Sequence, residues 1–124
     1  MESSAAAKSR HMVNRLLDHA SAVLSLIDDL PKTAASQTAR SQLARSVSSI
    51  GANYEEAQAA ESKNDFVHKL QIALKEARET CYWLRLLGKS KAAQQGQIDK
   101  LTQESIEIRA IISKAVITTK MRYR

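Results

Sequence analysis

The chain has 124 residues, of which 44% are hydrophobic and only 4% aromatic, with three glycines and one proline. This composition favours a single helical domain and argues against a β-sheet protein, which needs more aromatic residues and more frequent turns. Nineteen Lys and Arg against thirteen Asp and Glu give a net charge of +6. That charge favours polyanionic partners, although ordinary surface lysines explain it about equally well.

Cysteine content and hydropathy indicate the cellular compartment in which the protein is expected. Cys81 is the only cysteine, so an internal disulfide is impossible. No stretch approaches the ~20 consecutive apolar residues of a membrane-spanning helix. Residues 1–10 also lack the apolar core of a signal peptide. We therefore expect a cytoplasmic protein.

Residues 1–11 are small, polar and basic, and they show no helical periodicity. We expect a disordered basic tail, or an added non-native segment, followed by a single four-helix-bundle domain over residues 12–124. The first helix is predicted over residues 12–30, because apolar residues recur at three- and four-residue spacing, with Leu17 and Leu24 widening the stripe. Pro31 then ends this helix.

The second helix is predicted over residues 33–61, with Thr33 or Ser36 as its cap. Gly51 interrupts this helix, at a cost of about 1 kcal/mol relative to Ala, and Asn53 is another weak helix former. We interpret Gly51 as a position where another backbone packs closely.

A third helix over residues 63–87 begins at the capping pattern Ser62-Lys63-Asn64-Asp65, and Gly88 is expected to close it in the left-handed conformation. The fourth helix is predicted over residues 97–121. Four amphipathic helices with short connections favour an all-α, antiparallel up-down-up-down four-helix bundle.

The third helix carries more apolar surface than one stripe requires, which indicates self-association. The alternative is that its wide stripe faces two neighbours inside the same bundle. Two carboxylates that follow Gly51 could fix the register of such an interface. The candidate oligomer-interface residues are Gly51, Asn53, Glu55, Glu56, Ile72, Tyr82, Trp83 and Leu86.

No pattern in the chain predicts catalysis, a metal site or a cofactor. His11, His19 and His68 do not form the repeated Glu-x-x-His pattern of di-iron bundles. Cys81 lies in the apolar stripe without a neighbouring His, so we expect a small core residue. The carboxylates around Glu76 and Glu79 are expected to form intrahelical or intersubunit ion pairs. We therefore expect a protein that is not an enzyme.

Basic residues provide the remaining functional signal. In an up-down bundle the chain start and the end of the fourth helix lie at one end, so Lys8 and Arg10 could join the basic C-terminus in one patch. Binding would then be driven by phosphate contacts and would be sensitive to salt. The candidate nucleic-acid-binding residues are Arg15, Arg40, Arg45, Lys114, Lys120, Arg122 and Arg124.

Several ordered segments between Arg45 and Leu87 carry a family resemblance. They include Arg45 to Ala57, which reads Arg-Ser-Val-Ser-Ser-Ile-Gly-Ala-Asn-Tyr-Glu-Glu-Ala, then Ser62 to Phe66, Ile72 to Thr80 and Tyr82 to Leu87. The chain thereby resembles the bacterial four-helix-bundle family first associated with intervening sequences in 23S ribosomal RNA genes.

This resemblance implies an antiparallel bundle that assembles as a homopentamer without known enzymatic activity. A related branch, the accessory proteins of diversity-generating retroelements, forms basic pentameric barrels that bind nucleic acid and a reverse transcriptase. The leading hypothesis is a homo-oligomer that binds RNA or DNA. The alternative is a protein-interaction scaffold whose partner is a neighbouring-gene protein.

Overall fold

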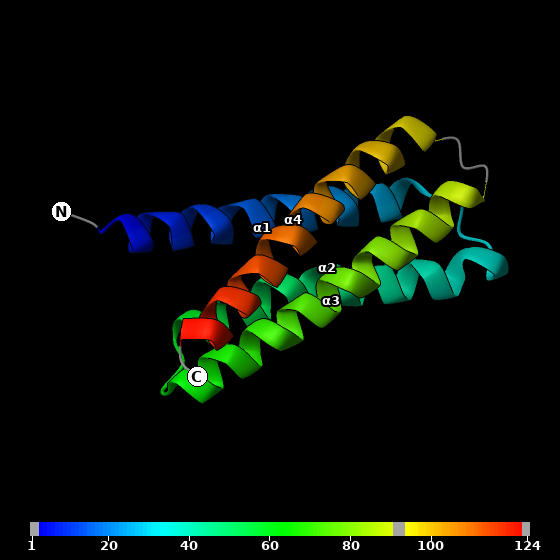
Figure 1. The fold of residues 1–124 in the computed structure, drawn as a ribbon. Coiled ribbons are helices and arrows are strands. Elements are labelled where there is room, and N and C mark those ends of the chain that lie inside the picture. The colour runs from blue at the N-terminus through cyan, green and yellow to red at the C-terminus, as the bar shows by residue number, and fades with distance from the viewer. Residues whose placement is uncertain (1–2, 91–93, 123–124) are drawn as a thin grey trace.

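The computed structural model describes residues 3–90 and 94–122, which form four helices. They are α1 (Ser4–Asp29), α2 (Ala34–Gln58), α3 (Lys63–Lys89) and α4 (Gln95–Arg122). Successive helices run in opposite directions (Figure 1). Each helix packs against its two neighbours, and α4 closes the cycle on α1. The predicted all-α four-helix bundle is confirmed.

Helix α1 starts earlier than the sequence pattern indicates. The expectation of a disordered tail is wrong for residues 4–11, which are helical. The Ser3 hydroxyl caps the helix by accepting a hydrogen bond from the Ala6 N–H at 3.0 Å. Ala5, Ala6 and Ala7 are the best helix formers, so the first turn needs no apolar stripe.

Local signals set most of the other helix ends. Leu30, which precedes Pro31, has an extended backbone with ψ of 148° and ends α1. The Thr33 and Ser62 hydroxyls cap α2 and α3 by accepting backbone hydrogen bonds at 3.2 Å and 3.0 Å, as predicted. The prediction for Gly88 is wrong, because this residue is helical and α3 continues through Lys89.

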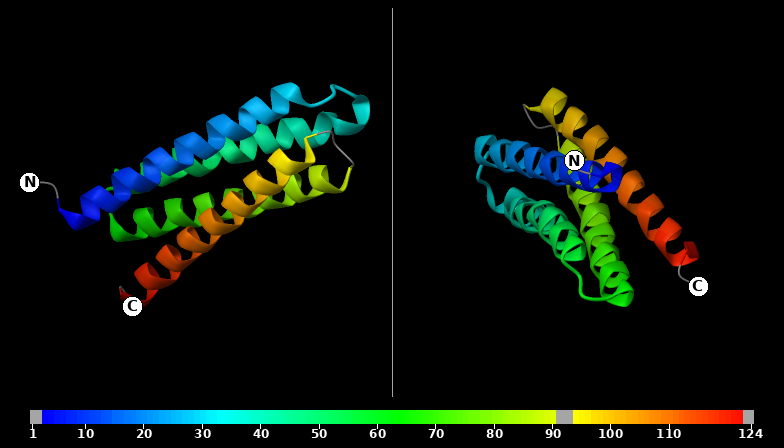
Figure 2. Two further views of the ribbon diagram at one scale, coloured as in Figure 1. Left: turned by 90° about the horizontal axis from the view of Figure 1, so that it is seen from above. Right: turned by 90° about the vertical axis from the view of Figure 1, so that its left-hand side faces the viewer.

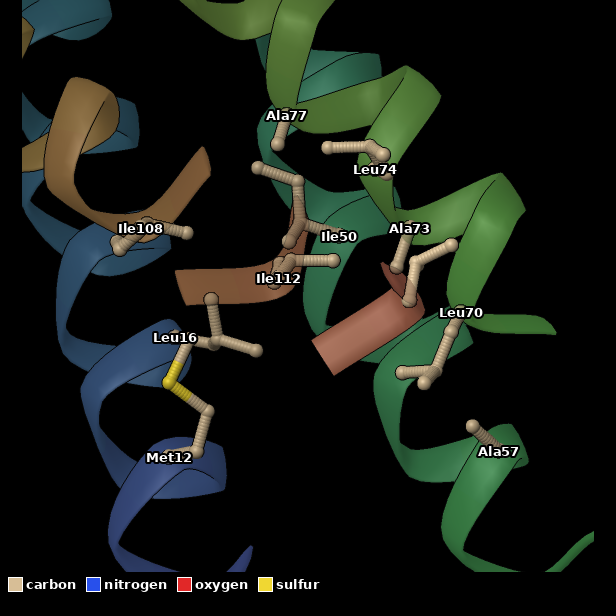
Figure 3. Packing of buried hydrophobic residues seen from close by; sticks show 11 residues of the cluster. Met12, Leu16, Ile50, Ala57, Leu70, Ala73, Leu74, Ala77, Ile108 and Ile112 are labelled. Carbon is tan, nitrogen blue, oxygen red and sulfur yellow. The ribbon is translucent and has the colours of Figure 1, made fainter. Parts of the chain in front are cut away.

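Two apolar clusters form the core. One gathers side chains from the half of the bundle that contains the helix α2–α3 connection, and Figure 3 shows them converging from all four helices. Its members are Met12, Leu16, Ile50, Ala57, Leu70, Ala73, Leu74, Ala77, Ile108, Ile112 and Val116. The other lies in the opposite half and consists of Val23, Leu26, Leu30, Ala39, Leu43, Val47, Leu84, Leu87, Ile98 and Leu101.

Buried polar side chains separate these clusters, and we call them the central polar layer: His19, Ser46, Thr80 and Ser105. The Thr80 hydroxyl lies 3.0 Å from the Ser46 hydroxyl and 2.9 Å from the Glu76 carbonyl oxygen. Across the bundle, His19 Nε2 lies 2.5 Å from the Ser105 hydroxyl. One pair thus joins α2 to α3, and the other joins α1 to α4.

The helices do not pack equally. Helices α2 and α3 share the most extensive pairing, and α1 and α4 the least. Leu17 and Leu24 on α1 are 58% and 39% exposed, so the prediction that they widen the core stripe is wrong. Figure 2 shows the start of α1 and the end of α4 at the same end of the bundle but diverging. None of the described helices is long and apolar enough to cross a membrane.

Candidate nucleic-acid interface

Arg15, a predicted phosphate ligand, is held by carboxylates of its own chain. Its Nε and Nη2 atoms donate to Glu104 Oε2 at 2.8 Å and Oε1 at 2.6 Å, and Glu107 lies 4.0 Å from Nη2. These hydrogen bonds raise the pKa of Arg15 and lower the pKa of Glu104. The bidentate pair joins α1 to α4 and neutralises the guanidinium locally.

Arg45 is held in the same manner on the other side of the bundle. Its Nη1 atom donates to Glu76 Oε2 at 3.0 Å, and its Nη2 atom donates to Glu79 Oε1 at 2.6 Å. The hydrogen bond to Arg45 lowers the pKa of Glu79. These carboxylates thus form ion pairs, but the pairs join α2 to α3 of the same chain, whereas pairs within one helix or between subunits were expected.

Arg40 has a role at the start of its own helix. Its Nε atom donates to the Ser36 hydroxyl at 3.0 Å, and its Nη2 atom donates to the Thr33 carbonyl oxygen at 3.3 Å. Three of the predicted nucleic-acid contacts, Arg15, Arg40 and Arg45, thus have structural partners within the chain.

Lys120 and Arg122 lie where α4 ends beside the start of α3. Two adjoining hollows of about 480 and 390 Å³ occupy this place, and both are lined by Lys63 and Thr119. Arg122 lines the first hollow and Lys120 the second. We call the two hollows together the terminal groove. Its polar and charged lining comprises Glu61, Ser62, Lys63, Asn64, His68, Gln71, Thr118, Thr119, Lys120 and Arg122.

The terminal groove combines predicted and unpredicted residues. Lys63 and His68 were not among the predicted ligands, although the Ser62 cap and the up-down topology together place the start of α3 near the end of α4. Lys114 is exposed but lines neither hollow. Arg124 lies outside the described residues.

The basic N-terminal residues do not extend this groove. Arg10 lines a separate hollow between α1 and α2, together with Val13, Glu55 and Gln58. Helix α1 also diverges from the end of α4 (Figure 2). The expectation that Lys8 and Arg10 merge with the C-terminal basic residues is therefore wrong for the single chain.

The predicted interface residues of α2 point in different directions. A Cβ atom on Gly51 would lie 3.6 Å from Leu16 Cβ of α1, which is an ordinary contact. Glu55 lines the hollow beside α1, whereas the exposed Glu56 lies three turns beyond Arg45, on the face that approaches α3. The Asn53 side chain donates to the Ser49 carbonyl oxygen at 2.9 Å within the helix.

The predicted interface residues of α3 do include exposed apolar side chains. Tyr82 and Leu86 are 54% and 44% exposed. The Tyr82 ring lies edge-on to Trp83, with ring centroids 4.9 Å apart. Ile72 and Trp83 are half-buried. Part of the surplus apolar surface therefore faces away from the bundle.

The described residues offer little for catalysis. No group of three or more His, Cys, Asp or Glu in this part of the chain is placed to hold a metal ion. Cys81 is buried, and burial raises its pKa, which disfavours the reactive thiolate. Sequence reasoning did not predict that His19 is buried, and burial lowers its pKa to about 4.

Comparison with known proteins agrees with the all-helical, four-helix bundle described above. The profile of the 23S rRNA-intervening sequence protein family matches residues 8–114, and the chain belongs to this family. A crystal structure of a protein of unknown function from the S23 ribosomal protein family of Bacteroides thetaiotaomicron is similar to it, with 35% sequence identity and a TM-score of 0.77. The match covers 85% of this chain and 97% of that one. No match was found among curated proteins.

Proposed function

We propose that the protein is a non-enzymatic, cytoplasmic homo-oligomer that binds RNA or DNA through phosphate contacts at the terminal groove. The observation that carries this proposal is the gathering of Lys63, Lys120 and Arg122 around two adjoining hollows that contain a single carboxylate, Glu61, in their described lining. Cations grouped in this way attract phosphates, whatever the base sequence.

Several features support an electrostatic mode of binding. The chain carries a net charge of +6, and rotational symmetry would repeat each groove around an assembly. A pentamer is the subunit number that the family resemblance implies. The name of the family, 23S rRNA-intervening sequence protein, favours RNA as the first ligand to test.

The test compares two double variants that remove the same charge. Lys120→Gln with Arg122→Gln alters the terminal groove, whereas Lys32→Gln with Lys89→Gln alters the opposite end of the bundle. Binding of a single-stranded RNA oligonucleotide and of duplex DNA is measured by fluorescence anisotropy over a range of salt concentrations.

We expect the terminal-groove variant to bind nucleic acid more weakly. On single strands, the slope of the logarithm of the binding constant against the logarithm of the salt concentration should become less steep by about 1.4, since two phosphate contacts are lost. The control variant should resemble the wild type. Equal weakening by both variants would contradict the groove assignment. A flat salt dependence, or no binding at low ionic strength, would contradict nucleic-acid binding altogether.

The second candidate function is a protein-interaction scaffold for a neighbouring-gene protein, without a nucleic-acid role. The exposed Tyr82 and Leu86 on α3 favour it. Absence of polyanion binding, together with a monomeric mass in solution, would support this candidate over the first.

A further inference from the structure

Helix α3 presents an exposed apolar face with a cationic border. Arg78, Tyr82, Arg85 and Leu86 are all exposed and lie at three-, four- and seven-residue spacing, so they share one side of the helix. Neither Arg78 nor Arg85 makes an ion pair within the described part of the chain. We call these four residues the α3 face.

The seam between α1 and α4 has the opposite character. It contains an open groove of about 520 Å³, whose apolar lining comprises Ala22, the buried Leu101 and the carbon atoms of the buried His19 ring. Asp18, Glu104 and Glu107 contribute three carboxylates to the same groove, of which Glu104 is paired with Arg15, and Lys100 is the one cation among the lining residues. We call it the seam groove. It lies along the least extensive helix pairing of the bundle.

A buried polar atom in the seam groove lacks a partner. His19 is 3% exposed, and its Nε2 atom bonds with Ser105, but its Nδ1 atom has no hydrogen-bond partner. A neutral imidazole has one donor and one acceptor, so in either tautomer one hydrogen bond is missing. Such a group costs free energy unless another molecule supplies the partner.

We propose that the α3 face of one copy docks into the seam groove of the next copy of the same chain. The proposal rests on the homo-oligomer part of the proposed function and assigns the two surfaces that make the contact. Tyr82 and Leu86 would cover the apolar lining, and the guanidinium groups of Arg78 and Arg85 would face carboxylates. Both kinds of contact are typical of protein interfaces.

The placement of the two surfaces sets the type of assembly. Helix α3 is diagonally opposite α1 in the cycle of helices, so the α3 face and the seam groove are different surfaces of one molecule. A contact between two different surfaces is head-to-tail, and it closes into a ring when the rotation per subunit permits.

The test is a charge exchange between the two surfaces. Arg78→Glu with Arg85→Glu reverses the α3 face. Asp18→Arg with Glu107→Arg reverses the rim of the seam groove and keeps the bidentate pair of Glu104 with Arg15. Masses of the wild type, of each double variant and of the fourfold variant that combines both reversals are measured by light scattering at low salt. Circular dichroism checks that each variant is helical.

We expect each double variant to dissociate, because like charges then meet at every contact. The fourfold variant should reassemble whatever the number of subunits in the ring, because each reversed α3 face then meets a reversed seam groove on the next copy. The terminal-groove variant Lys120→Gln with Arg122→Gln should keep the wild-type mass.

Double variants that keep the wild-type mass, or a helical fourfold variant that fails to reassemble, would overturn the assignment while leaving the homo-oligomer proposal intact. A monomeric wild type would instead contradict the homo-oligomer proposal itself, and the docking inference with it. Nucleic-acid binding is decided separately by the salt titration.

Discussion

His19 links the stability of the bundle to pH. Burial lowers its pKa from 6.5 to about 4, with Glu104 opposing this shift and Arg15 adding to it. The unfolded chain therefore binds more protons between these values, so stability falls as the pH decreases through this window. We expect a loss of about 2 kcal/mol at about pH 5 relative to neutral pH, measured by urea unfolding.

The variant His19→Gln is the control for this effect. Glutamine does not titrate and can still bond to Ser105, so most of the pH dependence above about pH 5 should disappear. The pKa values of Glu79 and Glu104 are lowered from 4.5, so their stabilisation is lost only at more acidic pH. An unchanged pH dependence in the variant would contradict the role of His19.

Gly51 offers a second test at the level of one residue. The structure leaves ordinary contact distance for a Cβ atom, 3.6 Å from Leu16 Cβ, so close packing within the chain does not require glycine. We expect Gly51→Ala to stabilise the isolated bundle by up to about 1 kcal/mol through helix propensity, measured by thermal or urea unfolding. A destabilised bundle would show that Leu16 cannot accommodate the methyl group. A loss of assembly with intact stability would instead place Gly51 at a subunit contact.

At the level of the helices, the sequence predicts best what depends on neighbours in the chain. The hydroxyl caps at Thr33 and Ser62 and the end before Pro31 depend on local geometry, and all three are found where expected. The early start of α1 was missed because the alanines near Ser3 form a helix without an apolar stripe. Gly88 was misjudged because glycine adopts helical geometry as readily as the left-handed one.

The first turns of α1 should be the least stable part of the bundle. No side chain between Ser4 and His11 is buried, whereas α2 and α3 share the most extensive pairing. We expect amides in residues 8–11 to exchange with solvent much faster than those near Leu43 or Ala77, as measured by hydrogen exchange. Equal protection at concentrations where the protein is monomeric would contradict this ranking.

For the whole molecule, net charge was a poor guide to which cations are available. The count of +6 is correct, but Arg15 and Arg45 bind carboxylates of other helices, and Arg40 supports the start of α2. These partners depend on which faces of the helices pack together. The sequence alone does not specify that arrangement. The terminal groove was partly predictable, because Lys120 and Arg122 lie at the end of the last helix, and Lys63 follows from the bundle topology.

The central polar layer also restricts sliding of the helices. If one helix shifted along its axis by one turn, about 5.4 Å, many apolar contacts would be replaced by others of similar size. It would, however, bring the buried hydroxyl of Thr80 away from Ser46, or the ring of His19 away from Ser105. Each separated pair would leave buried polar atoms unsatisfied, at about 1–3 kcal/mol. A core of leucine, isoleucine and valine alone would pack in several alignments of the helices. The central polar layer confines the helices to one alignment.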